Sequence, residues 1–141
     1  MQKFDDVNHW VVIFNQRYQN KRWWHPFVRP DFNHVVMLYD TAGHGTMVME
    51  ALEWGIAIRH EPKDIADCVE YYGYHATAIV SYIANHAYNV DPVTRGVFTC
   101  VSLCKAVLGL RKCFFVITPF QLYKFLLKQN SVVLKYYVPY T

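Results

Sequence analysis

The sequence predicts an α+β domain in which a small antiparallel sheet is packed by a helix that begins at a cysteine and by a second helix. Short runs of β-branched and aromatic residues, separated by polar or glycine-containing segments, are typical of strands. Two later segments carry apolar residues at helical spacing instead. The 141 residues, 53% of them apolar, are enough for a sizeable core but not for two full domains, so we expect residues 1–141 to form one domain.

The strands are predicted from runs that alternate with turn-forming residues. Two glycines within Asp40–Gly45 suit a hairpin connection between the second and third runs. Two prolines within Trp23–Pro30 exclude a regular helix or a central strand, so this segment is expected to be an aromatic-rich loop. The expected strands are His9–Phe14, Asn33–Tyr39, Thr46–Leu52, Gly55–His60, Ala76–Ala84 and Ser131–Val138. Ala76–Ala84 could also be a buried helix, but its β-branched residues favour a strand.

The helices are predicted from periodicity and from capping residues. Thr99–Leu110 has helical spacing of its apolar residues, with Thr99 as a plausible N-cap. Thr118 followed by a proline announces a second helix that runs to about Asn130. Within Glu61–Gly73, three apolar positions favour a short helix that begins near Pro62.

Composition excludes several classes of function. A net charge of +3, from 14 Lys+Arg and 11 Asp+Glu, is too mild and too scattered to indicate nucleic-acid binding. The longest apolar stretches, such as Ala76–Ala84, are shorter than the roughly 20 residues that span a bilayer. Residues 1–14 do not resemble a secretory signal, so we expect a cytoplasmic protein.

Four cysteines, at positions 68, 100, 104 and 113, match neither a zinc framework nor a dense disulfide scaffold. The seven histidines likewise match no zinc template. We therefore expect reduced thiols, no metal site and no cofactor.

Cys100 is the candidate nucleophile. It occupies the first expected helical position, where the helix N-terminus and a neighbouring imidazole would lower the pKa of a thiol. Free backbone N–H groups at the same helix end could form an oxyanion hole beside the sulfur. One place would thus offer a nucleophile and an electrostatic stabiliser. The alternative is that Cys100, like Cys104 one turn later, is a core residue.

The candidate base is His34, at the start of a strand, and Glu50 is the group that would orient it. If the hairpin pairs Asp40 with Thr46, then Val36 falls opposite Glu50, and His34 lies on the same face within diagonal reach. A shift of one residue would place Glu50 on the other face. In the alternative interpretation His34 is a structural histidine, and Glu50 is a rim charge or a capping acceptor.

These residues carry a resemblance to a family. A His-Val strand, a Val-Met-Glu-Ala strand with a Gly-Ile soon after it, and a Cys that opens an amphipathic helix resemble the circularly permuted NlpC/P60 (papain-like) hydrolases of the YaeF/YiiX type. The resemblance covers about residues 32–127. It implies that Cys100 is the nucleophile, His34 the general base and Glu50 the orienting residue. Cys100 is followed by Val101-Ser102, where family members commonly carry a more polar sequence.

The first functional hypothesis is a cysteine hydrolase. Its substrates would be peptides, amides or esters, and the resemblance implies peptidoglycan-type amides and carriage on a phage particle. The alternative is a non-catalytic structural or assembly component, such as a virion protein, that contacts partners through aromatic surfaces. Candidates for such surfaces are Trp23–Phe27 and the tyrosines at 71, 72 and 74. Binding of a small ligand without turnover is a third hypothesis.

Overall fold

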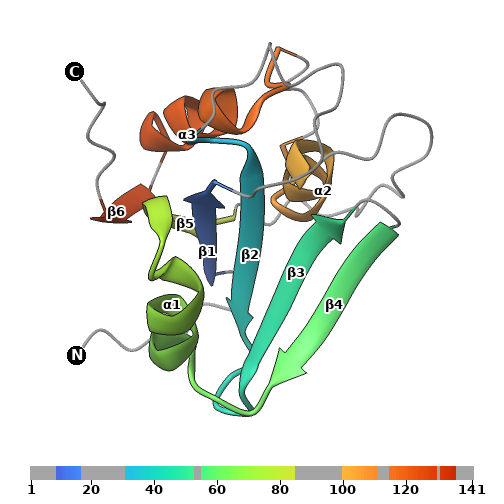
Figure 1. The fold of residues 1–141 in the computed structure, drawn as a ribbon, viewed down its shortest axis with the longest axis vertical. Helices are drawn as coiled ribbons and strands as arrows, with labels where there is room; N and C mark the ends of the chain where they lie inside the picture. Colours follow the sequence, from blue (N-terminus) through green and yellow to red (C-terminus); the bar gives the residue numbers. More distant parts are fainter. Residues whose placement is uncertain are drawn as a thin grey trace.

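The computed structural model describes residues 9–16, 31–52, 55–84, 100–110, 115–129 and 131–135. They form a six-stranded antiparallel sheet and three helices (Figure 1). The α+β class predicted from the sequence is therefore confirmed. The strands are β1 (His9–Asn15), β2 (His34–Asp40), β3 (Thr46–Leu52), β4 (Gly55–Glu61), β5 (Ala76–Ile83) and β6 (Ser131–Lys135), in the order β4-β3-β2-β1-β5-β6 across the sheet.

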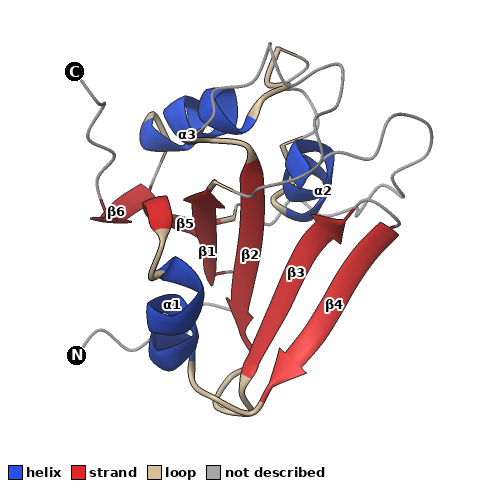
Figure 2. Cartoon of the chain, viewed as in Figure 1, coloured by secondary structure: helices blue, strands red, loops and turns tan. Residues whose placement is uncertain are grey.

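Helices cover both faces of the sheet. The helices are α1 (Ile65–Gly73), α2 (Cys100–Val107) and α3 (Pro119–Leu127). α1 packs against β1, β2 and β5, while α2 packs against β2 and β3, and α3 packs against β5 and β6. Figure 2 shows α2 and α3 toward one end of the sheet and α1 toward the other. The sequence predicted α2 and α3 more precisely than α1. The candidate site described below lies on the face of the sheet that α1 covers.

The two faces of β1 bury different sets of side chains, because successive side chains of a strand point to opposite faces. Val12 and Phe14 belong to the core under α2 and α3, whereas Val11 and Ile13 belong to the core under α1. All four are at most 2% exposed. This burial on both faces explains the continuous apolar run and places β1 at the centre of the sheet.

The β2–β3 hairpin has the register on which the expected contact of His34 with Glu50 depends. Asp40 pairs with Thr46, and Val36 pairs with Glu50. The turn requires glycine, since Gly45 has φ +102° and a Cβ there would meet the backbone oxygen of Glu61. This register decides which side chains of β2 and β3 share a face.

Capping residues fix two of the helices. Thr118 accepts a hydrogen bond from the backbone of Gln121, whose side chain binds the backbone of Thr118 in return, so the predicted N-cap is confirmed as a capping box. α1 begins at Ile65 and not near Pro62. The side chain of Asp64 caps it by accepting from the backbone N–H of Asp67 at 2.8 Å, and this N-cap was missed.

Several expectations fall on residues that the structure does not describe. The Trp23–Phe27 segment, Thr99 as an N-cap, Cys113 and the last residues of the expected strand Ser131–Val138 lie outside the described ranges. Among the helices of the described residues, none is long and apolar enough to cross a membrane.

Candidate functional site

His34 and Glu50 meet on the face of the sheet that α1 covers. His34 Nε2 lies 2.9 Å from Glu50 Oε2, and the side chains are 5% and 12% exposed. The contact is diagonal, because Glu50 pairs directly with Val36, two residues beyond His34. The predicted approach of these two residues is thus confirmed. A carboxylate in this position holds an imidazole in one orientation.

Arg59 also contacts the His34–Glu50 pair. The interpretation of the sequence did not predict this contact. Its Nη2 lies 2.7 Å from Glu50 Oε1, so each oxygen of the carboxylate has a partner. The hydrogen bond from His34, together with Arg59 and against the effect of burial, lowers the pKa of Glu50 to about 2. For Arg59, burial acts to lower the pKa, but Glu50 outweighs it and the pKa is raised. Glu50 is therefore ionised at neutral pH.

The register of the β3–β4 hairpin places Arg59 beside Glu50, so this contact could have been predicted from that register. Arg59 pairs with Val48, on the face that Glu50 also occupies, and it lies two residues beyond the direct partner of Glu50, Ala57. Both strands were predicted from the sequence, and diagonal neighbours follow from a hairpin register. Only the register of this second hairpin was left unassigned.

Arg59 connects this cluster to α1. Its Cζ lies 5.8 Å from the ring centroid of Tyr72, whose hydroxyl donates to Glu61 Oε1 at 2.9 Å. Burial, followed by the hydrogen bond to Glu61, raises the pKa of Tyr72. We name this set the polar network: His34, Glu50, Arg59, Tyr72 and Glu61.

Cys100 does not join the polar network. α2 does begin at Cys100, as predicted, but it packs on the other face of the sheet, where Cys100 contacts the core that contains Val35. Val35 and His34 are consecutive in β2, so their side chains point to opposite faces. The expected convergence of Cys100 with His34 and Glu50 therefore needs correction, because the structure brings only His34 and Glu50 together.

The surroundings of Cys100 disfavour a thiolate. Burial raises the pKa of its thiol to about 11, while the backbone amides of Val35, Val101 and Cys100 itself act in the opposite direction. The helix amides expected to form an oxyanion hole do face the sulfur, but burial outweighs them. Cys100 is partly buried, whereas Cys104 is fully buried, which raises the pKa of the Cys104 thiol well above the ordinary value. Cys100 resembles a core cysteine more than an activated one.

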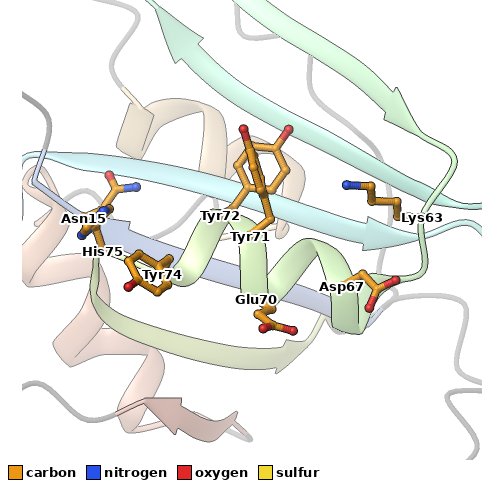
Figure 3. A pocket seen from close by; sticks show the side chains of 8 residues that line it. All are labelled: Asn15, Lys63, Asp67, Glu70, Tyr71, Tyr72, Tyr74 and His75. Atoms are coloured by element: carbon orange, nitrogen blue, oxygen red, sulfur yellow. The ribbon is translucent and has the colours of Figure 1, made fainter.

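A groove runs beside α1. It has a volume of about 730 Å³ and is lined by Asn15, Lys63, Asp67, Glu70, Tyr71, Tyr72, Tyr74 and His75 (Figure 3). The three tyrosines are the cluster that the sequence marked as suited to a surface. Tyr72 belongs both to this groove and to the polar network. Among the described residues, no group of three or more His, Cys, Asp or Glu side chains could hold a metal ion.

No family model, curated protein or solved structure matches the chain. The functional assignment of His34, Glu50 and the groove therefore depends on the geometry of this chain.

Proposed function

We propose that this domain is a non-catalytic structural or assembly component that acts by contacting other protein chains. The observation that carries the proposal is the placement of Cys100 and His34 on opposite faces of the sheet. With a thiol pKa of about 11, only about one thiol in 10⁴ is ionised at pH 7. In the part of the chain that the structure describes, His34 is directed away from Cys100 and is not placed to take the proton of its thiol.

An apolar strip crosses the sheet on the α2 face, and it supplies a contact surface. Ile58 is 60% exposed and Ile56 is 41% exposed, both on the edge strand β4. Beside them lie half-buried large side chains of the next strands. We name as the apolar strip Trp10, Tyr39, Met47, Met49, Ile56 and Ile58. Aromatic residues and methionine are enriched in protein interfaces.

We propose that a second copy of the chain pairs along β4, so that Ile56 and Ile58 at the edge of the strip meet the same residues of the second copy. β4 is an edge of the sheet in the described part of the chain, with the β3–β4 hairpin along that side (Figure 1). An antiparallel pairing centred on Ala57 would set Ile56 opposite Ile58 of the second copy, twice by symmetry. Arg59 would then stand opposite Gly55, so the two copies of Arg59 would not face each other. Edge strands are templates for such pairing.

The test of this pairing is sedimentation equilibrium of the wild-type protein and of two variants. Ile58→Lys should convert a dimer to a monomer, because it puts two cations into the centre of the pairing. Leu134→Lys is the matched control, since Leu134 is 52% exposed on the opposite edge strand, β6. This control should leave the dimer intact, and circular dichroism should show both variants folded. A monomeric wild type, or a dimer lost only in Leu134→Lys, would overturn the pairing.

A cysteine hydrolase is the second candidate function, and the His34–Glu50 contact favours it. An imidazole oriented by a carboxylate is half of a thiol-hydrolase site, and α2 begins at Cys100 as that mechanism needs. This candidate corresponds to the circularly permuted NlpC/P60, papain-like identity, with peptide, amide or ester substrates. It requires the His34 ring to turn to the α2 face and accept the proton of the thiol.

Alkylation by iodoacetamide, mapped to each cysteine by mass spectrometry, separates the two candidates. For an assembly component, the rate at Cys100 should rise only as the pH approaches 11, and His34→Ala should not change it. The internal control is Cys104, which should react still more slowly. Rapid alkylation of Cys100 below pH 8 that His34→Ala slows would favour the hydrolase and reject our first proposal.

A further inference from the structure

We propose that the surface formed by α3 and the segment before it binds an anionic lipid bilayer from the aqueous side. The residues that carry this proposal are two exposed apolar side chains and two exposed lysines, which we name the basic-apolar patch: Phe115, Ile117, Lys124 and Lys128. α3 lies at the end of the molecule away from the β2–β3 turn (Figure 1). No residue of the patch belongs to β4, so the proposal does not depend on pairing along that strand.

The net charge of the chain is small, but its distribution along the sequence is uneven. Residues 92–141 contain seven Lys and Arg and no Asp or Glu, whereas residues 1–91 contain seven Lys and Arg and all 11 Asp and Glu. All seven histidines also precede residue 92, so the charge of the later part stays constant between about pH 5 and pH 8. Such an asymmetry within one domain indicates a surface that attracts anions.

The two lysines of the patch share one side of α3. Lys128 is the C-cap residue and keeps the right-handed helical conformation, so it lies one turn from Lys124. Both side chains are exposed, and within the ranges that the structure describes no carboxylate forms an ion pair with either. Lys105 of α2 adds a third cation nearby, since its Nζ donates to the backbone oxygen of Val116 at 3.0 Å. The positive charge of this surface is therefore available to an external anion.

The apolar side chains of the patch are held in place by the elements around them. Phe115 is 67% exposed and Ile117 is 68% exposed, whereas Val116 between them is 2% exposed and belongs to the core. The backbone N–H of Ile117 donates to Gln121 Oε1 at 2.9 Å, and the ring of Phe115 contacts that of Phe125 edge to face at 6.1 Å. Two large apolar side chains thus project outward from a fixed segment.

The combination of cations and apolar side chains favours a lipid surface over other polyanions. Phe125, which contacts Phe115, is adjacent to Lys124 in the sequence and one turn from Lys128, so the lysines and the apolar pair share one surface. In a bilayer, lysines reach the anionic headgroups while neighbouring apolar side chains enter the boundary of the acyl chains. A nucleic acid would use the lysines but would offer no apolar layer to an isoleucine.

Co-sedimentation with vesicles tests the patch. The wild-type protein should bind phosphatidylcholine vesicles that contain about 30% phosphatidylserine at least about tenfold more tightly than pure phosphatidylcholine vesicles, and more weakly at higher salt. Lys124→Gln/Lys128→Gln should weaken binding to the anionic vesicles by about tenfold or more. Ile117→Ser should weaken it by about fivefold, because an apolar contact is lost while the charge is unchanged. All three side chains are exposed, so the fold should persist.

Each variant has a matched control outside the patch. Lys63→Gln/Lys135→Gln removes the same charge on the α1 side, where Lys135 Nζ contacts the backbone oxygen of Gly73. Val132→Ser removes a 63% exposed apolar side chain that lies beside Ser81 on β6. Both controls should bind the anionic vesicles about as the wild type does. The proposal is overturned by equal binding to the two kinds of vesicle or by equal losses in variants and controls. Unchanged binding in Ile117→Ser, with displacement by poly-uridine RNA, would also overturn it, in favour of a nucleic acid.

Discussion

His34 and Glu50 lie on neighbouring strands, two residues out of direct register, and their side chains meet at 2.9 Å. The contact links the start of β2 to the later half of β3 on the face that α1 covers. It gives the domain a buried histidine whose orientation is fixed by a carboxylate, whether or not a reaction uses it. It also makes the stability of the fold depend on pH.

Glu50→Gln should destabilise the protein at neutral pH and have little effect in strong acid. The folded-state pKa of Glu50 is about 2, against an ordinary value of 4.5, so the stabilisation is full above pH 4.5 and is lost as the pH falls toward 2. A shift of this size corresponds to about 3 kcal/mol, an upper value for the neutral-pH loss because glutamine keeps an acceptor. Urea unfolding between pH 2 and pH 7 measures it. Glu70→Gln, at an exposed carboxylate, should not alter the pH dependence, and an equal effect would refute the assignment.

Arg59→Met should raise the pKa of Glu50, because it removes the partner 2.7 Å from Oε1. The loss of stability should be small, about 0.5 to 1 kcal/mol, since the Arg59 side chain is 40% exposed and solvent screens the pair. NMR titration of the Glu50 side-chain carbon gives the pKa directly. The same titration in a Lys63→Met protein should match the wild type. An unchanged Glu50 pKa in Arg59→Met would show that His34 alone holds the carboxylate.

Gly45→Ala should cost more stability than Gly43→Ala, although both glycines have positive φ. At Gly43 a Cβ would meet nothing within 4 Å, so only the backbone strain of about 1 kcal/mol applies. At Gly45 it would meet the backbone oxygen of Glu61 and approach His60 Nε2 to 2.9 Å. We expect an additional loss of about 1 to 3 kcal/mol from this overpacking, measured by urea denaturation. Equal losses at the two glycines would show that the turn relaxes around the new side chain.

Thr118→Ala should destabilise α3 by about 1 kcal/mol, because it removes the hydroxyl that accepts from the Gln121 backbone at 3.2 Å. Thr118→Ser keeps that hydroxyl and should recover most of the loss. Thermal unfolding followed by circular dichroism compares the three proteins. If serine behaves like alanine, the threonine methyl, and not the cap, is what stabilises this end of the helix.

The sequence offered the β2–β3 register as a condition, the pairing of Asp40 with Thr46 across a turn with two glycines, and the structure has that pairing. Two glycines within residues 40–45 define the hairpin, and alternation then assigns His34 and Glu50 to one face. The N-cap of α3 was equally readable, since Thr118 is followed by a proline and then by Gln121. Both predictions depend on residues close together in the chain, where local geometry leaves few alternatives.

The position of Cys100 relative to His34 could not be read in the same way. Alternation shows that two residues share a face, but not which helix covers that face. Residues 84–99 separate β5 from α2 in the sequence, so no short-range pattern fixes which face of the sheet α2 covers. The helix start was correctly predicted, and the choice of face was wrong. A side chain on a distant helix can therefore be assigned to a site only once the layers are known.

The central position of β1 has a consequence for biosynthesis. β1 is the strand that joins β4-β3-β2 to β5-β6, and its partner β5 ends at Ile83, far later in the chain. During synthesis, the apolar run around Ile13 therefore lacks its β5 neighbour until β5 has left the ribosome. If β1 failed to pair, the sheet would separate into a three-stranded and a two-stranded part. Neither part would have a complete hydrophobic core.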